Sequence, residues 1–172
     1  MRNRVPVLGM AAAVTILVAC GGDKDSTEPN LLPTVTYKAT LTGAAERPTP
    51  VASNGTGSFT GVYDPNTGLM TYTVTYSGLG SASTASHIHC CGTDAQAVGV
   101  LVNFQTFGNV LFTPGPTSQT YNGVILLTPA FSASATINGD SLRKAMDAGL
   151  TYVNVHSSQF PGGEVRGQIV KQ

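Results

Sequence analysis

Three histidines are the side chains with the clearest capacity for chemistry in this sequence. His87 and His89 are separated by one residue, and on a β-strand residues i and i+2 point to the same face. His156 ends a segment in which Val153 and Val155 are expected to point into the core, so that His156 faces the other way. Two such strands side by side would bring three imidazoles together, the ligand set of many zinc and copper sites. The sequence therefore predicts a site for one copper or zinc ion, and the alternative is that the histidines only form hydrogen bonds with the backbone at the surface.

Two adjacent cysteines follow the first histidine pair. If the strand continues past His89, Cys91 lies on the same face as the histidines and Cys90 lies on the opposite face. Cys91 is thus the better candidate for a fourth metal ligand. The alternative is a vicinal disulfide between Cys90 and Cys91, which would stiffen a turn. We expect this disulfide in the metal-free protein, because the N-terminal sequence predicts export to an oxidising compartment.

The N-terminal sequence is typical of an export signal. Arg2 and Arg4 precede an apolar run over 5–19, which is shorter than the ~20 residues needed to cross a bilayer. The run ends in Leu-Val-Ala followed by Cys20, which resembles a bacterial lipobox. That resemblance implies cleavage before Cys20 and lipid attachment to it, whereas the alternative is an ordinary signal peptide followed by a chance cysteine.

The expected domain organisation follows from this N-terminus. We expect a lipoprotein signal peptide over 1–19, a flexible tether over 20–33 and one folded domain over 34–172. The expected location is the bacterial membrane, with lipid on Cys20 as the anchor and the domain on the periplasmic or surface face of an outer membrane.

Composition and missing motifs exclude several classes of function. The chain has 9 Lys and Arg against 9 Asp and Glu, only 10% charged residues and no basic cluster, which excludes a nucleic-acid partner. The sequence has no G-x-S-x-G motif and no P-loop, which argues against a hydrolase or a kinase.

Short strands are expected to position the candidate residues. Polar and apolar residues alternate over Val35–Thr42, and a turn over 64–68 separates two strands of a hairpin. The single expected helix covers Ser141–Ala148, with Asp140 or Ser141 as its N-cap. These elements predict an all-β fold, an antiparallel β-sandwich or Greek-key barrel of about eight strands with one short helix. The other expected strands are 58–63, 69–77, 86–90, 98–104, 121–128, 151–156 and 164–170.

Several motifs, in this order, resemble the CHRD (chordin) domain over about 36–170. The resemblance implies a β-sandwich module, found in secreted developmental antagonists and in many exported microbial proteins. It favours a non-catalytic module that binds a metal, or an unknown protein or small-molecule partner. The motifs are Leu41-Thr-Gly-Ala-Ala-Glu46, Gly55-Thr-Gly57, Ser86-His-Ile-His89, Tyr152-Val-Asn-Val-His156 and Gly162-Gly-Glu-Val-Arg-Gly-Gln168.

The histidines also resemble, more distantly, the copper half of copper/zinc superoxide dismutases. This resemblance implies His87, His89 and His156 as copper ligands and Arg166 as a guide for an anionic substrate. It gives the second expectation for function, a copper-dependent redox enzyme of the superoxide dismutase type. A complete bimetallic site is not expected, because the sequence has no fourth histidine. In the alternative interpretation, Arg166 forms an ion pair with a carboxylate such as Glu46 or Glu164.

Overall fold

The structure is a computed structural model that describes residues 30–106, 112–130 and 136–172. Residues 31–172 form one compact unit. The expected signal peptide, Cys20 and most of the expected tether lie outside the described residues. No helix within the described ranges is long and apolar enough to cross a membrane.

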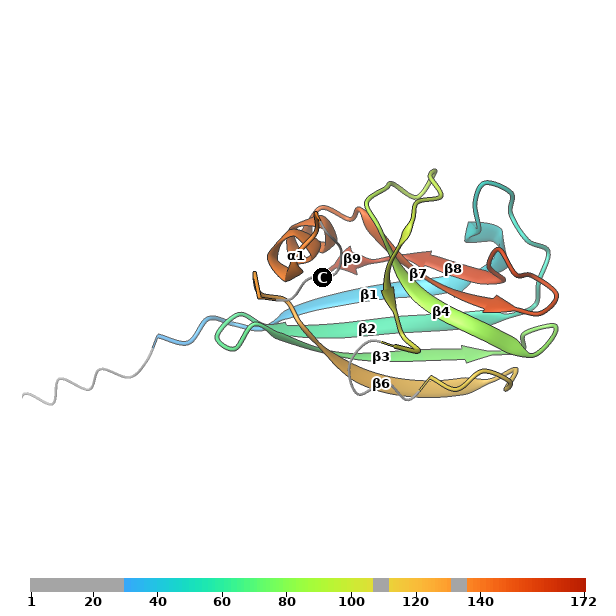
Figure 1. Ribbon diagram of the computed structural model, residues 1–172, viewed down its shortest axis with the longest axis horizontal. Helices are drawn as coiled ribbons and strands as arrows, with labels where there is room; N and C mark the ends of the chain where they lie inside the picture. The colour runs from blue at the N-terminus through green and yellow to red at the C-terminus, as the bar shows by residue number, and fades with distance from the viewer. Residues whose placement is uncertain (1–29, 107–111, 131–135) are drawn as a thin grey trace, which may run out of the picture. The chain divides into compact units, whose positions relative to one another are not determined.

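In the described part of the chain, nine antiparallel strands form one curled sheet (Figure 1), in the order β5-β4-β7-β8-β1-β2-β3-β6 with β9 beside β1. The prediction of an all-β antiparallel fold with one short helix is confirmed. The elements are β1 (Val35–Thr42), the 3-10 helix η1 (Gly43–Ala45), β2 (Thr56–Asp64), β3 (Leu69–Ser77), β4 (Ser83–Cys90), β5 (Val100–Asn103), β6 (Gln119–Leu126), α1 (Gly139–Asp147), β7 (Thr151–Ser157), β8 (Val165–Gln168) and β9 (Val170–Lys171).

The hydrophobic core lies inside the curl of the sheet. The ring of Phe104, just after β5, packs 4.8 Å from the ring of Tyr72 in β3 and 5.6 Å from that of Tyr121 in β6. The Tyr121 hydroxyl also donates a 2.6 Å hydrogen bond to Ser86 in β4. Strands far apart in the sheet order therefore face each other across the core, as in a sandwich. Each fully buried large apolar side chain stabilises such a core by about 1.5–3 kcal/mol.

The hairpin turn between β2 and β3 forms where the sequence predicts it. The Asp64 carboxylate accepts a 2.9 Å hydrogen bond from the backbone N–H of Asn66. Gly68 closes the turn at a φ of +73°, a backbone conformation that favours glycine.

Helix α1 begins two residues earlier than predicted. Its N-cap is Asn138, whose side-chain oxygen accepts a 2.9 Å hydrogen bond from the backbone N–H of Ser141. The predicted caps, Asp140 and Ser141, lie inside the first turn instead. Asparagine caps a helix as well as aspartate or serine does, so residue type alone did not show which of these neighbouring positions is the N-cap.

The pairing of β4, β7 and β8 positions the predicted metal ligands. His87 lies opposite Asn154 of β7, and Asn154 lies opposite Arg166 of β8. These side chains are on the face of the sheet that points away from the core. Even so, every residue of β7 is buried, so both faces of this strand are covered. Loops that contain Glu46, Thr93 and Pro161 contact this face and exclude water from it.

Candidate metal centre

The three predicted histidines converge. His87 and His89 of β4 and His156 of β7 each contribute one ring nitrogen to a group whose atoms all lie within 4.8 Å of one another. Nδ1 of His87 lies 3.0 Å from Nε2 of His156. An ion bound to imidazoles at about 2.0–2.1 Å separates its ligand atoms by about 3–4 Å. Small side-chain movements would therefore be enough to place all three histidines around one ion.

Backbone carbonyls orient two of the three rings. Nδ1 of His156 lies 2.9 Å from the carbonyl oxygen of Pro161, and Nδ1 of His89 lies 2.7 Å from that of Val98. A carbonyl oxygen can only accept, so each Nδ1 carries the proton and donates it. The Nε2 atom of each ring is then the one with a lone pair for a metal ion, and the hydrogen bond fixes its direction.

Asn154 is a member of this site to which the sequence analysis gave no role. Its side-chain oxygen lies 3.1 Å from Nε2 of His89, and its side chain also forms a hydrogen bond with Glu46. Because Nδ1 of neutral His89 already holds the proton, Nε2 and the Asn154 oxygen face each other with lone pairs only. A cation on Nε2 would remove this repulsion. Its place in the sequence could have indicated this role, because Asn154 precedes His156 by two residues and the two side chains of a strand at that spacing point to the same face.

Arg166 is part of a stack of side chains beside the histidines. Its guanidinium carbon lies 3.4 Å from the centre of the Tyr152 ring, and Tyr152 in turn stacks on His89 with ring centres 4.5 Å apart. Its side chain donates to the backbone oxygen of Thr93 over 3.3 Å. Arg166 is only 1% exposed, so in this conformation it presents no charge to a dissolved anion.

The expected ion pair of Arg166 does not form. Within the described part of the chain, neither Glu46 nor Glu164 has a carboxylate oxygen within 4.0 Å of the guanidinium, although the charge of Glu46 acts on it from a longer distance. Glu164 instead accepts hydrogen bonds from Ser53 and from the backbone N–H of Gly80. The sequence shows which charges are present, but the Tyr152 ring takes the place beside Arg166 that the prediction gave to a carboxylate.

Glu46 connects the loops that cover the site. It is buried, and burial raises the pKa of its carboxyl group to about 7 although the charge of Arg166 acts in the opposite direction. A β-carbon on Gly163 would lie 2.5 Å from an oxygen of Glu46, and Gly163 has a φ of +127°, so this position favours glycine. Next to this contact, a hollow of about 280 Å³ lies between the loop around Pro48 and the loop around Pro161.

The histidines are neutral at physiological pH in this environment. Burial lowers the pKa of His87 to about 4, and the positive charges that His156 and His89 would carry lower it further. Burial also lowers the pKa values of His89 and His156. Neutral imidazole is the form that binds metal. An unperturbed histidine would release an ion at about pH 6 to 5, and these shifts move the expected release to lower pH.

Cys91 is not among the converging side chains. Strand β4 ends at Cys90, so the alternation that placed Cys91 beside the histidines does not continue to it. A disulfide joins Cys90 to Cys91 in this structure. In this structure the sulfur of Cys91 is therefore not free to bind an ion.

A comparison with protein families identifies the domain. The family model for the CHRD domain matches residues 37–169, which include all three histidines, Asn154 and Arg166. No curated protein and no solved structure matches the chain, so the likeness to superoxide dismutases has no support from these comparisons. On the evidence of a family match over most of its length, the chain belongs to the CHRD domain family.

Proposed function

We propose that this protein is an exported, membrane-anchored CHRD module that binds one copper or zinc ion through His87, His89 and His156. The observation that carries the proposal is the approach of one nitrogen from each histidine to within 4.8 Å of the others. The low pKa values of these histidines support it, because no proton has to be displaced from an imidazolium at neutral pH.

The donor set suits both metals. Imidazole nitrogen is a common ligand of zinc and of copper. Three histidines leave further coordination positions open, which water, the Asn154 oxygen or a partner molecule could occupy. The hollow between the loops around Pro48 and Pro161 adjoins the carbonyl that orients His156, and it is our candidate position for a small-molecule partner.

Metal content of the purified full chain tests the metal site. We expect about one equivalent of copper or zinc per chain in the wild-type protein and much less in His89→Ala. Thr84→Ala is the matched control, because Thr84 lies exposed in the same strand and contributes no ligand. Equal metal content in wild type and His89→Ala would contradict the proposal.

The export part of the proposal is supported by the sequence around Cys20. We expect Cys20→Ser to prevent lipid attachment, so that the protein stays unprocessed or is released from the membrane fraction. Cell fractionation with mass spectrometry of the mature N-terminus measures both effects. Recovery of the wild-type protein as a soluble chain without lipid would show that the lipobox interpretation is wrong.

Copper-dependent superoxide chemistry is a second candidate. It is supported by the partial exposure of His87, which leaves one side of the histidine cluster accessible to a small molecule. Burial of Arg166 weighs against its predicted role as anion guide. We expect copper-loaded protein, but not zinc-loaded protein, to accelerate superoxide loss if this candidate is correct, because zinc has no redox chemistry. Equal rates with both metals would exclude it.

A further inference from the structure

Exposed apolar side chains gather on the outer face of β2, β3 and β6. Leu69 of β3 lies opposite Leu126 of β6, and Thr71, two residues further along β3, lies between Val62 of β2 and Val124 of β6. The valines and leucines in these two rows are all exposed, although residues of their size usually contribute to a core. Because the rows are adjacent, they form one continuous surface rather than scattered single residues.

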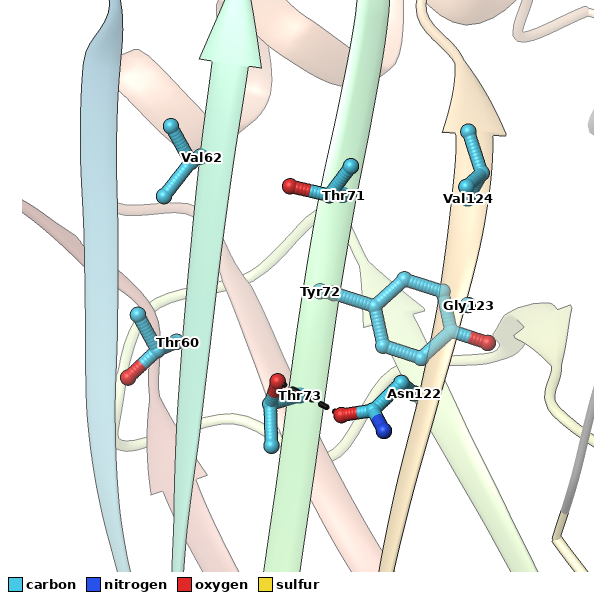
Figure 2. Close-up of a pocket in the computed structure, with 8 residues that line it drawn as sticks. All are labelled: Thr60, Val62, Thr71, Tyr72, Thr73, Asn122, Gly123 and Val124. Carbon is cyan, nitrogen blue, oxygen red and sulfur yellow. Dashed lines mark hydrogen bonds between the residues drawn. The ribbon is translucent and has the colours of Figure 1, made fainter.

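A shallow hollow of about 390 Å³ continues this surface along the same three strands (Figure 2). Threonine and valine side chains line it, and it contains no charged residue. The hydrogen bond between Thr73 and Asn122, drawn in Figure 2, joins two polar side chains of its lining over 2.8 Å. The lining residues are Thr60, Val62, Thr71, Tyr72, Thr73, Asn122, Gly123 and Val124.

The polypeptide enters the domain beside this apolar surface. The backbone N–H of Leu32 donates a 2.9 Å hydrogen bond to the Asn66 side-chain oxygen, and the Asn66 amide donates a 2.9 Å bond to the Leu32 carbonyl. Asn66 belongs to the turn between β2 and β3, which ends next to Leu69. Leu31 and Leu32 are themselves 67% and 56% exposed. Cys20 lies eleven residues before Leu31 in the sequence, so a lipid anchor on Cys20 would be connected to the domain at this end.

The metal centre is near the other end of the same sheet. Along β1, Val35 pairs with Tyr63 close to the β2–β3 turn, whereas Thr42 pairs with Arg166 beside the histidines. Seven residue steps separate Val35 from Thr42, which corresponds to about 23 Å of extended strand. An anchor at the turn therefore leaves the metal centre well away from the point of attachment.

We propose that this apolar end, formed by Leu31, Leu32, Val62, Leu69, Val124 and Leu126, rests on the surface of a lipid bilayer. The inference depends on the proposed membrane anchor, which holds this end close to the lipid. An anchored domain is at high effective concentration at the membrane, so a few apolar side chains are enough to orient it. A bilayer is favoured over a second copy of the chain because the attachment point and the apolar surface coincide. The metal centre then faces the aqueous side.

The absence of tryptophan from the sequence allows a direct test. Leu69→Trp places a single tryptophan in the apolar end. Val100→Trp is the matched control, because Val100 is 51% exposed and lies in β5, at the opposite edge of the sheet from β6. Each full-length, lipid-bearing variant is reconstituted into phosphatidylethanolamine and phosphatidylglycerol vesicles whose acyl chains carry bromine, which quenches tryptophan on contact.

We expect several-fold stronger quenching and a shift to shorter wavelength for Leu69→Trp compared with Val100→Trp. Val124→Trp should behave like Leu69→Trp and serves if Leu69→Trp does not fold, as judged by circular dichroism. Equal quenching of the two sites in protein that floats with the vesicles overturns the inference but leaves the anchor intact. Failure to float overturns both. A blue shift without bromine quenching, together with a dimer in sedimentation, indicates a second copy on this surface and also overturns the inference.

Discussion

Strands β3 and β7 of the curled sheet share the same alternating pattern of side chains, but their outer faces differ in exposure. On β3 every outward side chain, whether leucine, threonine or serine, stays partly or fully exposed, whereas on β7 the outward side chains Tyr152, Asn154 and His156 are buried, as are the valines between them. The difference comes from the loops, which cover β7 but leave β3 open. Buried polar groups must find partners within the protein, and this requirement fixes the positions of the histidines. We therefore expect metal chemistry on the face that loops shield from water, and contact with a membrane on the face that they leave open.

We expect the largest effect on stability from a substitution at Gly163, where the loops over β7 contact Glu46. We expect Gly163→Ala to destabilise the domain by about 3 kcal/mol, since it places a β-carbon against Glu46 at a φ of +127°. The neighbouring Gly162→Ala is the control, because a β-carbon there meets no atom within 4 Å, and it should change stability by less than about 0.5 kcal/mol. Urea unfolding measures both, and equal effects would mean that the loop contact does not matter.

Substitution of two asparagines, one on each face, allows a direct comparison of the covered face with the open face. Asn154→Ala should cost about 2 kcal/mol, because it leaves the buried Glu46 carboxyl group without its hydrogen bond from the Asn154 side chain. Asn122→Ala removes only a hydrogen bond to Thr73 at an exposed position and should cost less than about 0.5 kcal/mol. Thermal unfolding of both variants tests the difference. Similar costs would contradict the view that burial separates the two faces.

The pH dependence of stability should show opposite contributions from neighbouring groups in metal-free protein. His87 has an ordinary pKa of 6.5 and a folded pKa of about 4, so the unfolded chain binds more protons between these values and stability falls as pH decreases through this window. Glu46 has an ordinary pKa of 4.5 and a folded pKa of about 7, so its contribution falls as pH rises through that range.

Glu46→Gln separates these two contributions. Removing the carboxyl group should make the loss of stability on acidification from pH 6.5 to 4.5 steeper than in wild type, because the opposing contribution is gone. Asp64→Asn is a control at an exposed carboxylate in the β2–β3 turn. Urea unfolding at several pH values measures the slopes, and an unchanged slope in Glu46→Gln would show that Glu46 does not titrate as described.

The sequence was sufficient for the local features of the metal centre. The spacing of His87 and His89 placed both on one face, because the period of a strand is two residues wherever it occurs. The same rule failed for Cys91, because the alternation was extended one residue beyond the end of β4. Local pattern gives the face of a side chain only as far as the strand continues.

The long-range features of the site were not predictable in this way. The two-residue period of a strand does not predict that β4 pairs with β7, nor that the register places His87 opposite Asn154. It also does not state which loops fold over the outer face, so the burial of Arg166 against Tyr152 and of Glu46 against Gly163 was missed. These contacts join segments distant in sequence, and only the folded chain shows them.

Calorimetric titration of the full chain with copper(II) and zinc(II) tests the shared metal centre most directly. We expect one ion per chain, with His87→Ala, His89→Ala and His156→Ala each losing most of the affinity and a double variant losing little more, because ligands of one ion act as a unit. Thr84→Ala should keep the wild-type affinity. Full affinity in His156→Ala would contradict the account, since it would show that His87 and His89 bind the ion, if at all, without the third histidine.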